Sequence, residues 1–350
     1  MTMGIQTLDE RSCEVLKSLI QAHIQTGEPV GSETLVRRLA RPLSAATVRN
    51  IMAELERKGY LSHPHTSAGR VPTDDGYRFY VDSLMGARPL SPRDAAAIRS
   101  DLRTRGASTH QVMENASHLL SRLSRNVGFV LAPNIARTTF RRIDLVRLPH
   151  PRILVVLVSQ TGLVTQKVIE VEENVTSEAL RACENYLNAH FAGMCLSAIR
   201  GRLLELMREE KALYDSLLKN VLSVGERAFT GDEGDGDVYL DGTANILDRL
   251  EFEDLARMRA LFMTFEEKGR LVKILNACIS GPGVRVIIGH ENPEPDLRDL
   301  SLVTAAYPVQ GEPGWALGVM GSMRMEYVRV VALVGHVARE VSAALTEMSA

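Results

Sequence analysis

The feature that most constrains the fold is the helix expected from the stretch SAATVRNIMAELERKG, residues 44–59. Four apolar residues recur in it at helical spacing and form one stripe. They are Val48, Ile51, Met52 and Leu55. Ser44 precedes the helix as an N-cap and Gly59 follows it at the C′ position. This segment therefore predicts a helix with defined ends, one face for a core and one face for solvent.

Two helices are expected before it, over residues 8–24 and 32–39, because glycine and proline interrupt the apolar periodicity between them. After it come a short strand at residues 60–61, a polar loop, and a return strand at residues 70–71. A further helix is expected directly after Thr73, which is its N-cap. Three helices followed by a hairpin are the order of a winged helix-turn-helix, in which one helix enters the major groove of DNA.

The exposed face of the 44–59 helix carries side chains that suit a DNA groove. Arginine can pair with guanine, asparagine with adenine, and hydroxyls with phosphate. The candidate residues are Ser44, Thr47, Arg49 and Asn50. The segment from Arg37 to Arg78 contains eight basic and four acidic residues, whereas the whole chain has a formal charge of −2. This predicts a local basic patch, although the same arginines would also be expected if they only kept an amphipathic helix in solvent.

The loop after residue 61 has three possible roles. His63 and His65 offer two imidazoles for a metal, but a structural zinc site needs four ligands, and no cysteine or third histidine is near. The loop can also be an ordinary solvent-facing connection. A wing that touches phosphate explains more of its composition, because Thr66, Ser67 and Arg70 are hydrogen-bond donors around a hairpin tip. No metal is therefore expected.

Motifs for catalysis or for a cofactor are absent from the sequence. It contains no Walker A sequence, no G-x-G-x-x-G that opens a helix, and no nucleophile elbow. The four cysteines are scattered without a C-x-x-C pair, which is typical of reduced thiols in the cytoplasm. No apolar run is long enough to cross a membrane, and no signal peptide is recognisable. We therefore expect a cytoplasmic protein that is not an enzyme and has no cofactor.

The remainder of the chain alternates between helical and strand patterns. One helical stretch is expected over residues 92–125. Three strands follow at 141–148, 152–159 and 163–171, which form either a meander or the edge of a larger sheet. A helix-rich interval over 177–228, an acidic glycine-rich loop with one strand, a helix over 254–279, further strands and a last helix over 325–345 complete the pattern. Strands on both sides of a helical interval predict one α+β domain interrupted by an insertion, or else separate domains.

Several stretches closely resemble the HrcA family of heat-inducible transcription repressors. They are PVGSETL (29–35), LSAATVRNIMAELERKGYL (43–61), HPHTSAGRVPTDDGYRFYVD (63–82), VIIGHE (286–291), LVTAAY (302–307) and GVMGSMRMEY (318–327). The resemblance implies an α+β multidomain protein: an N-terminal winged helix-turn-helix, a GAF-like α+β domain and an inserted helix-rich dimerisation domain. Carried over by position, it implies DNA contacts from Ser44, Thr47, Arg49 and Asn50 on the recognition helix. On the wing it implies contacts from His65, Thr66, Ser67 and Arg70.

The implied domains are a winged helix over residues 1–88, a linker and the start of a connecting helix over 89–105, a GAF-like domain over 106–172 and 246–350, and an inserted domain over 173–245. The implied function is repression of chaperone operons by a homodimer on an inverted-repeat operator of double-stranded DNA. The chaperonin GroEL would support the active form, and heat stress would remove it. The alternative is a regulator whose GAF-like domain senses a metabolite.

Overall fold

The computed structural model describes most of the chain, and the statements below apply to those residues. They are 8–64, 69–86, 88–103, 107–132, 139–149, 152–162, 164–170, 176–195, 198–199, 202–203, 205, 224–225, 238–246, 263–265, 267, 270–272, 274–275, 283–309 and 312–349.

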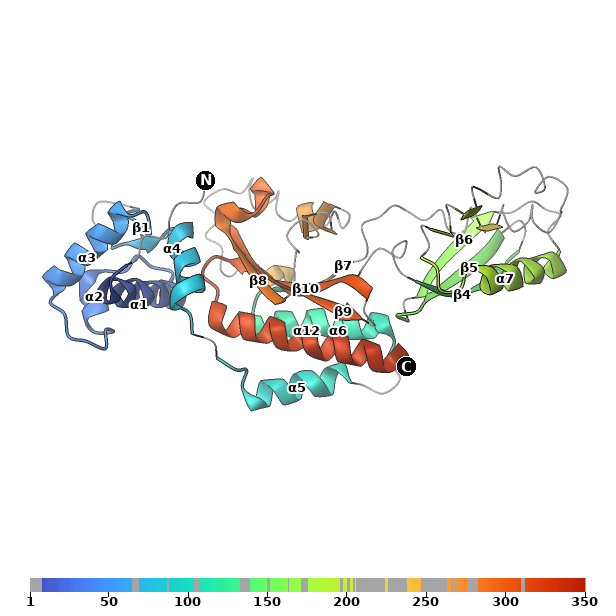
Figure 1. The fold of residues 1–350 in the computed structure, drawn as a ribbon. Helices are drawn as coiled ribbons and strands as arrows, with labels where there is room; N and C mark the ends of the chain where they lie inside the picture. The colour runs from blue at the N-terminus through green and yellow to red at the C-terminus, as the bar shows by residue number, and fades with distance from the viewer. Residues whose placement is uncertain are drawn as a thin grey trace.

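The N-terminal unit contains three helices and a two-stranded hairpin (Figure 1). The helices are α1 (Glu10–Thr26), α2 (Ser32–Val36) and α3 (Ala45–Arg57), and the strands are β1 (Leu61–Ser62) and β2 (Val71–Pro72). Ser44 caps α3, as the sequence predicts, by accepting a hydrogen bond from the Thr47 amide at 3.1 Å. Gly59 follows the helix with φ +85°, a conformation that favours glycine. Local sequence therefore determines both ends of α3.

The chain then forms α4 (Asp74–Phe79), which continues into a π-helical turn, η1 (Tyr80–Leu84). Thr73 is the N-cap of α4: its Oγ1 accepts from the Gly76 amide at 3.1 Å and donates to the Gly59 carbonyl at 2.6 Å. Tyr77 and Tyr80 are buried. The same threonine thus starts α4 and links it to the end of α3.

A five-stranded antiparallel sheet forms the centre of the molecule (Figure 1). Its strand order is β7 (Val238–Asp241), β3 (Val127–Leu131), β10 (Glu312–Ser322), β9 (Leu300–Val309) and β8 (Gly283–Ile288). Two long helices, α6 (Thr109–Ser124) and α12 (Tyr327–Ser349), cover one face. The apolar residues on that face join one core cluster with those of α1, α3 and α4, so the N-terminal unit and the sheet share buried surface.

The helical stretch expected over residues 92–125 is two helices in the structure. α5 (Pro92–Leu102) ends before residue 103, and α6 begins after Ser108. Ser108 forms a capping box with Gln111, which gives the second helix its own start. α5 packs on the outer side of α6 and α12 (Figure 1). The expectation of one helix was wrong because it passed over Gly106 and the start signal at Ser108, both of which separate two helical patterns.

The three-strand meander forms a sheet of its own. β4 (Phe140–Arg147), β5 (Arg152–Ser159) and β6 (Val164–Glu170) pair in the order of the chain, and α7 (Ser177–Phe191) covers one face. The side-chain amide of Asn188 in α7 accepts a hydrogen bond from the Ile143 backbone nitrogen at 2.8 Å and donates one to the Ile143 carbonyl at 2.9 Å. These two bonds satisfy backbone groups at the outer edge of β4.

The apolar residues of this smaller sheet form a core cluster that is separate from those of the larger sheet. The strand pairing and the shared core therefore group residues 140–170 with α7. The domain boundaries expected from the sequence instead place these residues in the GAF-like segment 106–172. An alternating strand pattern gives no indication of which sheet the strand joins, which is the physical reason for this difference. None of the described helices has the length and apolar character needed to cross a membrane.

Candidate nucleic-acid interface

The exposed face of α3 presents the predicted recognition residues together. Ser44, Arg49 and Asn50 are exposed and Thr47 is half-buried. The Ser44 and Thr47 hydroxyls lie 2.8 Å apart and take part in the helix cap. Arg49 and Asn50 form no side-chain hydrogen bond or ion pair with any described residue. Two residue types that can read base edges are therefore available at the N-terminal half of this helix.

The opposite face of α3 is fixed by burial. Val48 and Leu55 are fully buried and Met52 nearly so, against Leu16, Leu19 and Leu35 in the same core cluster. Burying a side chain of this size stabilises the fold by roughly 1.5–3 kcal/mol. The exposed residues are thus presented on a helix that cannot rotate without exposing its apolar stripe.

Arg70 holds the hairpin to α3. Its Nε donates to Glu56 Oε2 at 2.8 Å, and both side chains are partly buried. Its backbone pairs with Val30, with N–H to carbonyl distances of 2.9 and 3.0 Å in the two directions. The sequence predicts that this arginine contacts phosphate, but its guanidinium is engaged with α3 in the structure.

Gly69 is required by close packing at the same place. A Cβ at this position would lie 2.3 Å from the Val30 carbonyl carbon and 2.8 Å from the Gly31 nitrogen. Those are backbone atoms, which cannot move aside as the end of a side chain can. His65, Thr66 and Ser67, the other predicted wing residues, lie outside the residues that the structure describes.

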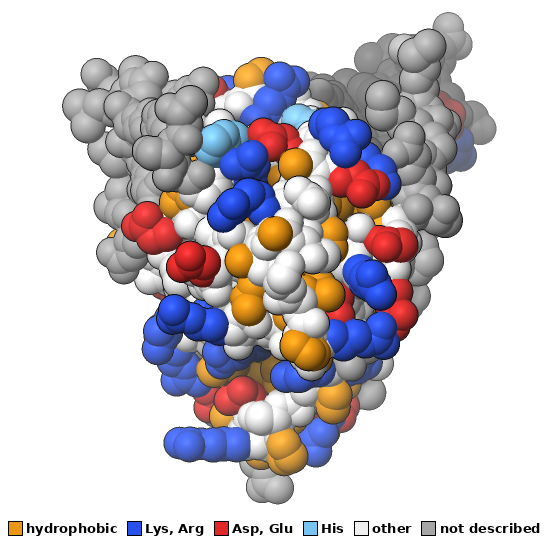
Figure 2. All heavy atoms as spheres, turned by 90° about the vertical axis from the view of Figure 1, so that its left-hand side faces the viewer, with side chains coloured by type: hydrophobic (Ala, Val, Ile, Leu, Met, Phe, Trp, Pro, Cys, Tyr) orange, Lys and Arg blue, Asp and Glu red, His pale blue; other side chains and the backbone are white. Residues whose placement is uncertain are grey.

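The end of the molecule that carries α2 and α3 is not uniformly basic. Figure 2 looks onto this side and shows lysine and arginine side chains spread over it, with acidic and apolar side chains between them. Several of the arginines are paired, such as Arg41 with Glu10 at 2.9 Å and Arg38 with Gln25 at 2.9 Å. The charge of this face therefore favours a polyanion through particular residues rather than through a broad field.

Helix α4 joins the N-terminal unit to the central sheet through three residues, Asp74, Tyr77 and Arg78, which we call the α4 joint. Arg78 forms a two-pronged ion pair with Glu291, in which Nε to Oε1 is 2.6 Å, and its Nη2 donates to the Val286 carbonyl at 2.7 Å. Asp74 Oδ2 accepts from the His290 backbone nitrogen at 2.8 Å and contacts its Nδ1 at 2.9 Å. Val286 belongs to β8, and His290 and Glu291 follow it directly.

Tyr77 completes the joint on the apolar side. Its hydroxyl lies 2.8 Å from His23 Nδ1 of α1, and its ring lies 6.0 Å from that of Tyr327 in α12. Tyr327 in turn donates to the Met323 carbonyl at 2.8 Å. Burial raises the pKa of Tyr77 well above its ordinary value, so the phenol stays protonated. Sequence reasoning missed the ion pairs of this joint, because the acidic first turn of α4 is explained equally well by the helix dipole.

Known proteins resemble the chain over nearly its whole length. The family model described as the HrcA protein C-terminal domain matches residues 110–331. A relative from Geobacter sulfurreducens, named heat-inducible transcription repressor HrcA, is 42% identical over 96% of this chain and 97% of its own. The chain belongs to the HrcA family.

Other comparisons agree with this membership. A second relative, the heat-inducible transcription repressor HrcA of Syntrophobacter fumaroxidans, is 38% identical over 97% of this chain and 98% of its own length. A crystal structure titled a hypothetical protein, at 2.2 Å resolution, superimposes with a TM-score of 0.66 and 23% identity, covering 97% of this chain and 99% of that one. The mixed helix and sheet fold of this HrcA member therefore has an experimental counterpart.

Proposed function

We propose that the chain is a sequence-specific DNA-binding repressor of chaperone operons, acting in the cytoplasm on an inverted-repeat operator. In this proposal α2, α3 and the β1–β2 hairpin form a winged helix-turn-helix, and α3 is the recognition helix. The observation that carries it is the exposed pair Arg49 and Asn50, without partners among the described residues, on a helix whose other face is fully buried. Membership of a family of heat-inducible transcription repressors supports the same function.

The test is a gel-shift titration of the full chain against an inverted-repeat fragment from a chaperone promoter and against random duplex. Arg49→Ala is expected to weaken operator binding by about 1–3 kcal/mol and to reduce the preference over random duplex. Arg57→Ala is the matched control, since Arg57 is also exposed on α3 but lies more than two turns further along it. If Arg49→Ala retained the full preference, α3 would not be the helix that reads the bases.

We propose that the protein binds as a homodimer through the inserted unit, because a two-fold operator requires two copies held at a fixed spacing. We propose that a second copy of the chain packs against the face of the small sheet that points away from α7. Side chains of directly paired residues on neighbouring strands point to the same face of a sheet. Val146 pairs with Leu154 and Leu154 with Val168, while Val158 pairs with Val164. Val146, Val164 and Val168 are 48%, 55% and 50% exposed, so apolar surface is available there.

Sedimentation of Val168→Glu tests this surface. The variant is expected to sediment as a monomer and to lose most of its operator affinity, while the control Gln166→Glu, on the same strand and face, is expected to remain a dimer. Dimers that persist in Val168→Glu would place the contact elsewhere on the molecule.

We also infer that the central sheet with α6 and α12 is the GAF-like domain and that the inserted unit begins near residue 139 rather than at 173. The grouping of β4–β6 with α7 supports that boundary.

We also propose that the chaperonin GroEL maintains the active form of the repressor, and that heat lowers the amount of this active form. Adding chaperonin to the gel shift after mild heating is expected to restore operator binding, and an unchanged bound fraction would count against its role.

A further inference from the structure

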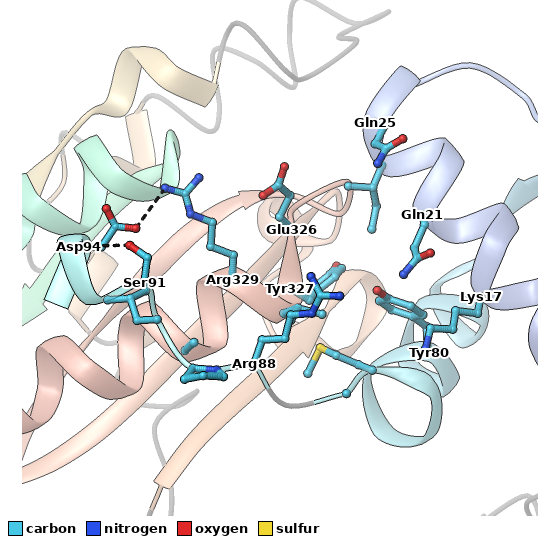
Figure 3. Close-up of a pocket in the computed structure, with 17 residues that line it drawn as sticks. Lys17, Gln21, Gln25, Tyr80, Arg88, Ser91, Asp94, Glu326, Tyr327 and Arg329 are labelled. Carbon is cyan, nitrogen blue, oxygen red and sulfur yellow. Dashed lines mark hydrogen bonds and ion pairs between the residues drawn. The ribbon is translucent and has the colours of Figure 1, made fainter. Parts of the chain in front are cut away.

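A cavity of about 720 Å³ lies between the N-terminal unit and the central domain (Figure 3). Its walls come from α1, from η1, from the connecting segment (residues 88–91) and from the first turns of α5 and α12. Its volume is within the range of sites that hold small molecules. Because the walls belong to both sides of the α4 joint, the cavity exists in this form only while the two parts are docked.

Charged side chains converge on this cavity with an excess of positive charge. Three basic residues, Lys17, Arg88 and Arg329, line it together with two acidic ones, Asp94 and Glu326. Asp94 is paired with Arg329 at 3.9 Å. Lys17 and Arg88 have no ion-pair partner among the described residues, which leaves two cations available. Glu326 is also without an ion-pair partner among the described residues, so the unpaired lining charges are two cations and one carboxylate. An anion that contacts either cation gains a charge-assisted hydrogen bond.

The floor of the cavity is aromatic and apolar. Figure 3 shows Arg88 reaching from the connecting segment toward Tyr327, with Tyr80 and Gln21 on the opposite side and Glu326 pointing away from the Tyr80 ring. Burial raises the pKa of Tyr80, while Gln21 and Arg88 act in the other direction, so both lie close to its phenol. Met85 adds an apolar surface beside these rings. The cavity thus offers a charged end and an apolar body.

We propose that this cavity binds a small organic anion, a carboxylate or phosphate monoester with an aromatic or aliphatic body. The anionic group lies between Lys17 and Arg88, and the body lies against Tyr80, Tyr327 and Met85. A ligand that contacts both walls binds the docked arrangement more tightly than any other and therefore favours it. Its effect on operator affinity rests on the proposed function; its binding does not.

The first experiment is isothermal titration of the full chain with phenyl phosphate, inorganic phosphate and benzylamine. Phenyl phosphate is expected to bind saturably and to raise the thermal midpoint, inorganic phosphate to bind more weakly, and benzylamine not to bind. Arg88→Ala and Lys17→Ala are each expected to weaken phenyl phosphate binding about tenfold or more. Arg93→Ala, an exposed arginine that does not line the cavity, is expected to leave it unchanged.

Three results would overturn the site: no saturable binding of phenyl phosphate, equal affinity for inorganic phosphate, or the same loss in Arg93→Ala as in Arg88→Ala. A second experiment measures operator affinity with and without phenyl phosphate. Linkage requires operator and phenyl phosphate to change each other's affinity by the same factor. An unchanged operator affinity would refute the coupling. A chain that binds phenyl phosphate but no operator would instead refute the proposed function and leave the site in place.

Discussion

Arg70 Nε lies 2.8 Å from Glu56 Oε2 and ties the returning strand of the hairpin to the last turns of α3. If Arg70 acts through this pair, Glu56→Ala and Arg70→Ala should lower operator affinity by similar factors. Each should also lower the free energy of unfolding by about 0.5–1 kcal/mol, as partly exposed ion pairs do. Urea titration and gel shifts of both variants measure the two effects.

A direct phosphate contact would give the opposite pattern. Arg70→Ala alone would then weaken binding and flatten its salt dependence, and Glu56→Ala would leave the affinity unchanged or raise it, because the guanidinium is released and a carboxylate near the DNA is removed. The comparison therefore separates a positioning role from a contact role.

Gly69→Ala is expected to destabilise the N-terminal unit by about 1–3 kcal/mol, because the new Cβ would collide with the Val30 backbone. Gly86→Ala is the control, since nothing lies within 4 Å of a Cβ there. It should change the free energy of unfolding by less than about 0.5 kcal/mol. Denaturant unfolding measures the free energy of unfolding of both variants. If the two values were equal, the backbone at the base of the hairpin would accommodate the Cβ without losing stability.

Breaking the Arg78–Glu291 pair should loosen the docking of the N-terminal unit. A double-mutant cycle with Arg78→Ala and Glu291→Ala is expected to give a coupling energy of about 0.5–2 kcal/mol in urea unfolding. Operators with half a helical turn inserted between half-sites provide a second measurement. The wild type should reject them and Arg78→Ala should reject them less, whereas unchanged rejection would mean that the joint does not set the spacing.

Alkaline pH should destabilise the small sheet unit through Cys183. Burial raises the pKa of this thiol from 9.0 to about 11. The folded state therefore holds a proton that the unfolded state releases, so stability is complete below pH 9 and falls as pH rises from 9 toward 11. Urea midpoints measured across this window should fall less steeply in Cys183→Ala. Identical slopes would show that groups other than Cys183 cause the loss.

Features that depend on neighbouring residues in the chain were predictable from the sequence. The caps at Ser44 and Thr73 and the turn at Gly59 were predicted and are confirmed, because each depends on residues within a few positions. Of the predicted stripe of α3, Val48, Met52 and Leu55 are buried and Ile51 is half-buried. The three strands after residue 140 were predicted as either a meander or the edge of a larger sheet, and the structure has the meander.

Contacts between distant residues were not predictable. Asp74 and His290 are 216 positions apart, and their two contacts depend on how α4 docks against β8. The charge of Asp74 at the start of a helix is explained equally well by the helix dipole, so it gave no signal of a partner. Likewise, the pair of Arg70 with Glu56 could not be predicted, because it depends on how the hairpin packs against α3.

The separation of the small sheet's core from the other two has a consequence for how the molecule melts. The N-terminal unit shares its core with the α6–α12 face of the central sheet, so these parts should unfold together, while the unit of β4–β6 and α7 depends on its own cluster. Calorimetry should then record two transitions rather than the three that the domain pattern implies. In such a chain, moderate heat can melt the unit proposed to join the two copies while the DNA-reading end stays folded, which turns a bivalent protein into two weak monovalent ones.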